Sequence, residues 1–163
     1  MKLISSSVII LLLPFIYAAV PVNSGSTVQD YCNERFGYCM EYPEDIFTQE
    51  FFPDNGDGVL LISTDNMTRL RVSGSYNVLD WTMKDIYYFT FEDKTRENSK
   101  MQNIDSDLGE NEFEATFVVG KTLQYVHGFK QADSYIILSI EVPVSDSERL
   151  TNLKDLVTLS FNA

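Results

Sequence analysis

The sequence has very few of the residues that usually carry out catalysis. Its 163 residues include one histidine, two cysteines and one tryptophan. The single histidine, His127, lies in an alternating apolar segment, which favours a position on a sheet face over the role of catalytic base. No Gly-x-Ser-x-Gly motif, phosphate-binding loop or dinucleotide fingerprint occurs. We therefore expect no catalytic residues and no cofactor, and we predict that the protein is not an enzyme.

Basic residues and long apolar runs are also scarce. Lysine and arginine together number 12 against 24 aspartates and glutamates, which gives a formal net charge of −12. Nucleic acids and anionic membrane surfaces attract basic proteins, so both are disfavoured as partners. After the first residues, no segment reaches the roughly 20 apolar residues that a membrane helix needs. The acidic composition by itself indicates solubility.

The first residues have the pattern of a secretory signal. Lys2 precedes an apolar run over residues 8–15, and two small residues follow at Ala18 and Ala19. We expect residues 1–18 to be a signal peptide, residues 19–29 a flexible leader and residues 30–163 a single domain. This organisation predicts a periplasmic or secreted protein without membrane insertion after cleavage.

The two cysteines stand seven positions apart, at Cys32 and Cys39, on either side of an expected turn. An exported chain meets oxidising conditions, under which such a pair persists as a disulfide. The alternative is a redox or metal site, but two thiolates and one histidine make a poor zinc set. We predict a disulfide across a hairpin and no metal site.

Residues 54–58 form a cluster of Asp, Asn and Gly that is typical of a tight turn. Calcium binding is the alternative, because carboxylate and amide oxygens are calcium ligands. Gly56 and Gly58 occupy alternate positions at which an EF-hand loop needs oxygen ligands. A turn without calcium is therefore the favoured interpretation.

Alternating apolar and polar residues predict a sheet over most of the remaining chain. Strands are expected at residues 59–63 and 69–75, and then as an antiparallel meander at 101–108, 113–119, 123–129 and 135–142. A helix through Leu150 and Leu153 follows, with an N-cap region at residues 145–147. Residues 159–161 close the chain.

The segment from residue 80 to residue 96 has two possible interpretations. Leu79, Met83 and Ile86 fall on one helical face, and Asp80 is a suitable N-cap. Residues 86–91 are nonetheless rich in the β-branched and aromatic residues that favour strands. We predict a helix with the Leu79, Met83 and Ile86 stripe in the core.

That helix would leave Trp81 and Tyr88 on the opposite side, with Asp85 nearby. Large aromatic side chains with a polar rim are typical of protein-binding hot spots. The alternative is that a second layer of the protein covers these aromatics as part of the core. Trp81, Asp85 and Tyr88 are our candidate partner-binding residues.

Several short phrases resemble the PsbP-like superfamily, namely residues 35–38, 42–43, 55–58, 73–77 and 160–161. This group includes the extrinsic protein of photosystem II, a nuclear Ran-binding protein, the bacterial lipoprotein DcrB and the EagR secretion chaperones. The resemblance covers residues 31–161 and is to the small secreted bacterial members. Cys39 departs from the pattern, because a serine commonly stands there.

The resemblance implies an α+β fold, an α-β-α sandwich with a central antiparallel sheet flanked by helices. It also implies a docking or assembly role without catalysis, and it supplies no active-site residues. We therefore expect an exported accessory protein that binds another protein, in its sharpest version an immunity or inhibitor protein against a toxin. The alternatives are a secreted hydrolase that uses acidic residues and a small-ligand or calcium-binding protein.

Overall fold

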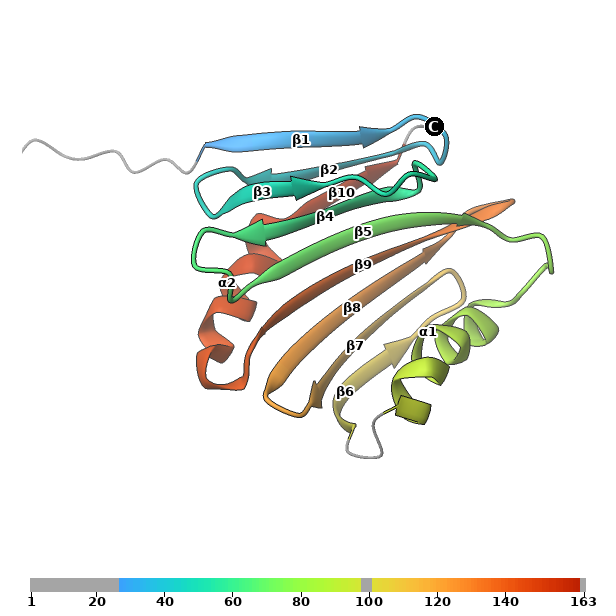
Figure 1. The fold of residues 1–163 in the computed structure, drawn as a ribbon. Coiled ribbons are helices and arrows are strands. Elements are labelled where there is room, and N and C mark those ends of the chain that lie inside the picture. The colour runs from blue at the N-terminus through green and yellow to red at the C-terminus, as the bar shows by residue number, and fades with distance from the viewer. Residues whose placement is uncertain (1–26, 98–100, 162–163) are drawn as a thin grey trace, which may run out of the picture.

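The computed structural model describes residues 27–97 and 101–161, and that part of the chain forms ten strands and two α-helices (Figure 1). The predicted signal peptide, residues 1–18, lies outside the described residues. The first strand begins at Val28, so it includes the last two residues of the expected leader. Seven strands form a large antiparallel sheet in the order β3-β4-β5-β9-β8-β7-β6. These strands are β3 (Phe47–Phe51), β4 (Gly58–Ser63), β5 (Arg69–Tyr76), β6 (Gln102–Leu108), β7 (Glu112–Val119), β8 (Thr122–Lys130) and β9 (Ser134–Pro143).

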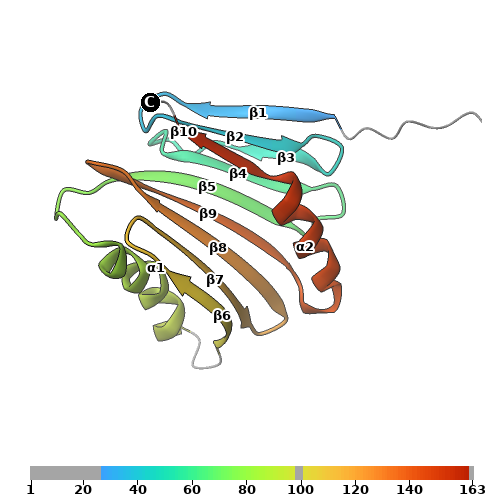
Figure 2. The ribbon, with the colours of Figure 1, turned by 180° about the vertical axis from the view of Figure 1, so that it is seen from behind.

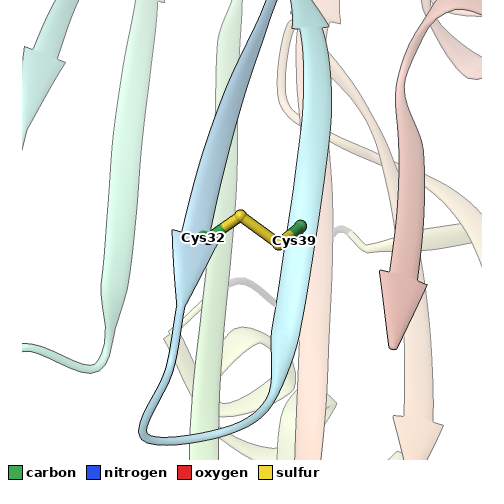
Figure 3. The surroundings of a disulfide bond; sticks show 2 residues. All are labelled: Cys32 and Cys39. Carbon is green, nitrogen blue, oxygen red and sulfur yellow. A yellow bond between two sulfur atoms is a disulfide. The ribbon is translucent and has the colours of Figure 1, made fainter. Parts of the chain in front are cut away.

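A small sheet lies beside the large one and contains β1 (Val28–Asn33), β2 (Tyr38–Pro43) and β10 (Thr158–Phe161). β1 and β2 form a hairpin in which Cys32 pairs directly with Cys39. The two cysteines are joined by a disulfide across the hairpin, which confirms that prediction (Figure 3). β10 pairs with the other edge of β2 and so brings the end of the chain back to its first strands.

One face of the large sheet packs against the small sheet and against helix α2 (Ser147–Leu156) (Figure 2). The core on this face includes Tyr38 and Tyr42 from β2, Leu138 and Ile140 from β9, and Leu153 from α2. These side chains are buried because alternate residues of each strand point to the same face. The predicted helix through Leu150 and Leu153 is confirmed, and both residues are buried.

The opposite face of the large sheet packs against helix α1 (Met83–Glu97). Met83 and Ile86 from the helix are buried against Phe113 and Phe117 from β7. Tyr135 of β9 packs on this side, whereas the next residue, Ile136, belongs to the other core. The two helices therefore lie on opposite faces of the sheet.

The expected α-β-α sandwich is present only in part, because the fold is mostly β. One helix lies on each face, but α2 shares its face with the three-stranded sheet. The four-strand meander from β6 to β9 is confirmed. The sequence patterns missed β3, whose residues Phe47–Phe51 lie in a mixed apolar and acidic segment.

Two details of the predicted helix at residues 80–96 are wrong. Leu79 is 67% exposed and precedes the helix, so it does not belong to the core stripe. The side chain at the helix start is Thr82 and not Asp80: Thr82 Oγ accepts a hydrogen bond from the Asp85 N–H at 3.3 Å. The Thr82 N–H donates to Asp85 Oδ2 at 2.9 Å, which completes a reciprocal capping arrangement.

Candidate functional site

Five apolar side chains of the β5–α1 connection and of α1 are exposed or half-buried, and we call them the α1 patch: Val78, Leu79, Trp81, Tyr88 and Phe89. Val78 is 84% exposed, Leu79 67%, Tyr88 60% and Phe89 51%. Large apolar side chains that are exposed close together commonly mark an interaction site, and the Trp81 and Phe89 rings lie 4.7 Å apart. The α1 patch is therefore a candidate protein-binding surface.

The segment that leads from β5 into α1 has a fixed backbone. The side-chain amide of Asn77 donates to the Trp81 carbonyl at 3.0 Å, and the Trp81 N–H donates to Asn77 Oδ1 at 2.8 Å. The Asn77 N–H in turn donates to the Asp133 carbonyl at 2.7 Å, which ties the segment to the β8–β9 turn. Asp80 lies between these anchors with φ of 51°, a left-handed conformation that few non-glycine residues adopt. The hydrogen bonds thus hold Val78 and Leu79 in the solvent.

The three predicted binding residues occupy different positions. Tyr88 is exposed on the outer side of α1, as predicted. Trp81 does not lie opposite the core as predicted: it precedes the helix and is half-buried against the cluster of Met83, Ile86 and Phe113, with its ring 4.7 Å from that of Phe89. Asp85 caps the helix, and hydrogen bonds from Thr82 lower the pKa of its carboxyl group. Asp85 therefore serves to begin the helix beside the exposed aromatics.

Sequence reasoning missed Val78, Leu79 and Phe89. The helical register placed Leu79 in the core because Asp80 was taken as the N-cap, whereas the helix begins at Met83. The Thr82 and Asp85 pair was the available signal, since Thr-x-x-Asp before an apolar run resembles a capping box. With Thr82 as N-cap, Leu79 falls outside the helix.

A second feature is a groove between the β6–β8 end of the large sheet and the α2–β10 segment. It consists of three cavities of about 660, 420 and 270 Å³. The cavities adjoin, because Glu112, Glu114 and Phe129 each line two of them. We call this feature the acidic groove, because two lysines and seven acidic residues line it: Lys130, Lys154, Asp105, Asp107, Glu110, Glu112, Glu114, Asp133 and Asp155.

His127 lies in the floor of the acidic groove, with its side chain 18% exposed. Its Nε2 atom is 3.6 Å from a Glu112 carboxylate oxygen, and its Nδ1 atom is 3.2 Å from the Tyr125 hydroxyl. Nε2 is buried and has no hydrogen-bond partner among the described residues. Burial lowers the pKa of His127 below its ordinary 6.5, against the opposing effect of Glu114 and Glu112. His127 thus lies half-buried on one face of β8, the sheet-face position that the alternating pattern predicted.

Lys154 of α2 closes one side of the acidic groove. Its ammonium group lies 3.2 Å from Glu114 Oε2 and 4.1 Å from the centre of the Tyr125 ring. Burial tends to raise the pKa of Glu114, but hydrogen bonds from Lys154 and Tyr125 outweigh it and leave that pKa below its ordinary value. Lys154 therefore neutralises one acid of the groove.

The loop at residues 54–58 uses its oxygen atoms within the protein. Arg35 donates to the Asn55 carbonyl and to Asp57 Oδ1, both at 3.1 Å. Asn33 donates to the Gly56 carbonyl at 3.0 Å. The loop thus fastens the β1–β2 hairpin to β4. The prediction that it does not bind calcium remains to be tested.

Residues 27–97 and 101–161 contain no group of three or more His, Cys, Asp or Glu side chains arranged to hold a metal ion. Within the same ranges, neither helix is long and apolar enough to cross a membrane.

Comparisons with known proteins identify the fold. No protein-family model matches the chain, and no curated protein sequence matches it significantly. The solution structure of cyanobacterial PsbP from Synechocystis sp. PCC 6803 is similar, with a TM-score of 0.59 and 12% identity, over 88% of this chain and 99% of that one. A crystal structure from Bacteroides thetaiotaomicron VPI-5482 has a TM-score of 0.40 and 16% identity, over 77% of this chain and 45% of that one. The likeness to cyanobacterial PsbP shows that the fold is PsbP-like, as the sequence resemblance indicated.

Proposed function

We propose that this PsbP-like chain is an exported accessory protein that binds another protein through the α1 patch. The observation that carries the proposal is the exposure of Leu79 and Tyr88 beside a backbone that Asn77 holds in place. A partner that covers these side chains removes apolar surface from water, which is favourable by about 25 cal/mol per Å². Little ordering entropy opposes binding, because the segment is already fixed.

The fold supports an accessory or binding role in general, although proteins of one fold have many partners. Export is supported by the Cys32–Cys39 disulfide, since disulfides persist in oxidising compartments. The α1 patch offers an apolar centre, with Asp80 and Asp85 as its nearest acidic neighbours in the sequence. Such a centre with a charged rim suits a protein partner better than a nucleic acid.

The sharper form of the proposal is an immunity or inhibitor protein against a toxin. The net charge of −12 supports this form when the toxin is basic, because opposite charges accelerate association. A toxin or secretion gene beside the gene for this protein would favour this role over that of a general assembly factor.

Affinity capture with paired variants tests the binding surface. The protein is immobilised and exposed to an envelope extract of its own cells, in parallel with Leu79→Asp and Met67→Asp. Met67 is a matched control, because it is 60% exposed in the β4–β5 turn, at the other end of β5 from the α1 patch. We expect the wild type and Met67→Asp to retain the same protein and Leu79→Asp to retain at least tenfold less. Equal retention by all three, or none by the wild type, would refute the proposal.

A further inference from the structure

β6 is the free edge of the large sheet (Figure 1). Within the part of the chain that the structure describes, it pairs only with β7, and all seven of its side chains are exposed. An unpaired edge presents a row of main-chain N–H and C=O groups that another strand can join. The register of β6 shifts between Asn103 and Asp105, so its regular part, from Asp105 to Leu108, has the backbone geometry of a strand-docking site.

The charge along β6 is negative and incompletely neutralised. Asp107 lies directly opposite Glu114 of β7, and Asp105 lies opposite Thr116. Like charges directly opposite each other on a sheet are destabilising. Lys154 pairs with Glu114, but among the described residues no basic side chain forms an ion pair with Asp105 or Asp107. A cation supplied from outside would offset this repulsion.

We propose that β6 docks an extended, basic segment of a partner polypeptide as an additional strand. Asp105 and Asp107 are two residues apart and line the same cavity of the acidic groove. Because side chains of a strand alternate between faces, a partner strand places lysine or arginine beside both aspartates when its basic residues recur at every second position. Its intervening residues lie beside Ser106 and Leu108, which suit small or apolar side chains.

A second copy of the same chain is a poor occupant of this edge. β6 contains two aspartates and no basic residue, so pairing two β6 strands would bring four carboxylates together. Charged side chains on an edge strand commonly prevent self-association for this reason. The charge pattern thus selects a basic partner. The inference concerns a different surface from the α1 patch and does not depend on it.

Synthetic peptides test the proposal directly. The probe is a fluorescein-labelled nonapeptide in which lysine alternates with valine and threonine, titrated with the intact protein at about 0.1 M salt. Two control peptides have the same composition: one has its lysines grouped at one end, and the other has alternate backbone amides N-methylated to block strand pairing. We expect the alternating peptide to bind at least tenfold tighter than either control.

Charge variants of the protein complete the test. The double variant Asp105→Asn, Asp107→Asn should bind the alternating peptide about tenfold more weakly, since two exposed ion pairs are lost. The control Asp30→Asn, Glu41→Gln removes the same charge from a facing pair in the small sheet and should bind as the wild type does.

Three results would overturn the proposal. Equal binding of all peptides would show nonspecific attraction to the acidic surface. Equal losses of peptide affinity in the two double variants would also show nonspecific attraction to the acidic surface. If the wild type binds no peptide below 1 mM while Asp105→Asn, Asp107→Asn sediments as an oligomer, the aspartates serve only to keep the edge free.

Discussion

The Asn77 side chain forms two hydrogen bonds with the backbone of Trp81: it donates to the carbonyl at 3.0 Å and accepts from the N–H at 2.8 Å. These two hydrogen bonds fix the loop that connects β5 to α1. The residues between them include Val78 and Leu79, the most exposed members of the α1 patch. One asparagine therefore determines how the proposed binding surface is presented.

Replacing Asn77 with alanine should make the connection that carries Val78 and Leu79 more mobile. We expect Asn77→Ala to lower the free energy of unfolding by about 1–3 kcal/mol, because two partly buried hydrogen bonds are lost. Capture of the partner should weaken as well, since the loop must then be ordered on binding. Urea unfolding measures the first effect. The control is Asn111→Ala, whose exposed side chain should matter little; an equal effect in both variants would contradict the assigned role.

Three aromatic substitutions separate surface from core at α1. Phe91 is 6% exposed and its ring lies 5.1 Å from that of Phe117, so Phe91→Ala should destabilise by about 3–5 kcal/mol. Tyr88 is 60% exposed, so Tyr88→Ala should change stability by less than about 0.5 kcal/mol. Trp81 is half-buried, so the loss of stability in Trp81→Ala should fall between those of the other two variants. Thermal and urea unfolding rank the three, and a loss for Tyr88→Ala as large as for Phe91→Ala would place Tyr88 in the core.

The sequence predicted the elements whose side chains alternate most clearly. Phe113 and Phe117 alternate with polar residues, and β7 was identified from that pattern. The Cys32 and Cys39 pair predicted both a hairpin and its disulfide. In these segments local pattern and final burial agree, because each strand has one buried and one more exposed face.

The features that sequence reasoning missed depend on contacts between distant residues. β10 pairs with β2, so that Thr158 lies opposite Glu41, and no local pattern encodes that partner. The acidic groove depends on Lys154 reaching Glu114, forty residues away. β3 was missed because its residues do not alternate between apolar and polar. Only the first of them, Phe47, is buried.

Removing the disulfide should weaken the small sheet. We expect the double variant Cys32→Ser, Cys39→Ser to lose about 2–3 kcal/mol of stability, the loop-closure entropy of an eight-residue loop. A reductant should lower the urea midpoint of the wild type and leave the double variant unchanged. Thiol labelling of unreduced, denatured protein should find no free cysteine. Two labelled thiols would contradict the disulfide.

His127 should make stability depend on pH. Its pKa in the folded protein is lowered by burial, so the unfolded chain binds the proton more readily. The contribution of His127 is therefore full above its ordinary pKa of 6.5 and is lost as pH falls below that value. Urea unfolding from pH 8 to pH 5 should show a decline that His127→Gln reduces. An unchanged decline would assign the effect to Glu112, Glu114 or other acids instead.

Site-specific photo-crosslinking in the native cells tests the central claim, that the α1 patch binds another protein. Benzoylphenylalanine replaces Leu79 in one variant and Met67 in the control, two exposed apolar positions of similar accessibility. Irradiation followed by immunoblotting and mass spectrometry identifies any adduct. The proposal predicts one discrete protein crosslinked from position 79 and none from position 67. No adduct at position 79, or the same adducts from both positions, would contradict it.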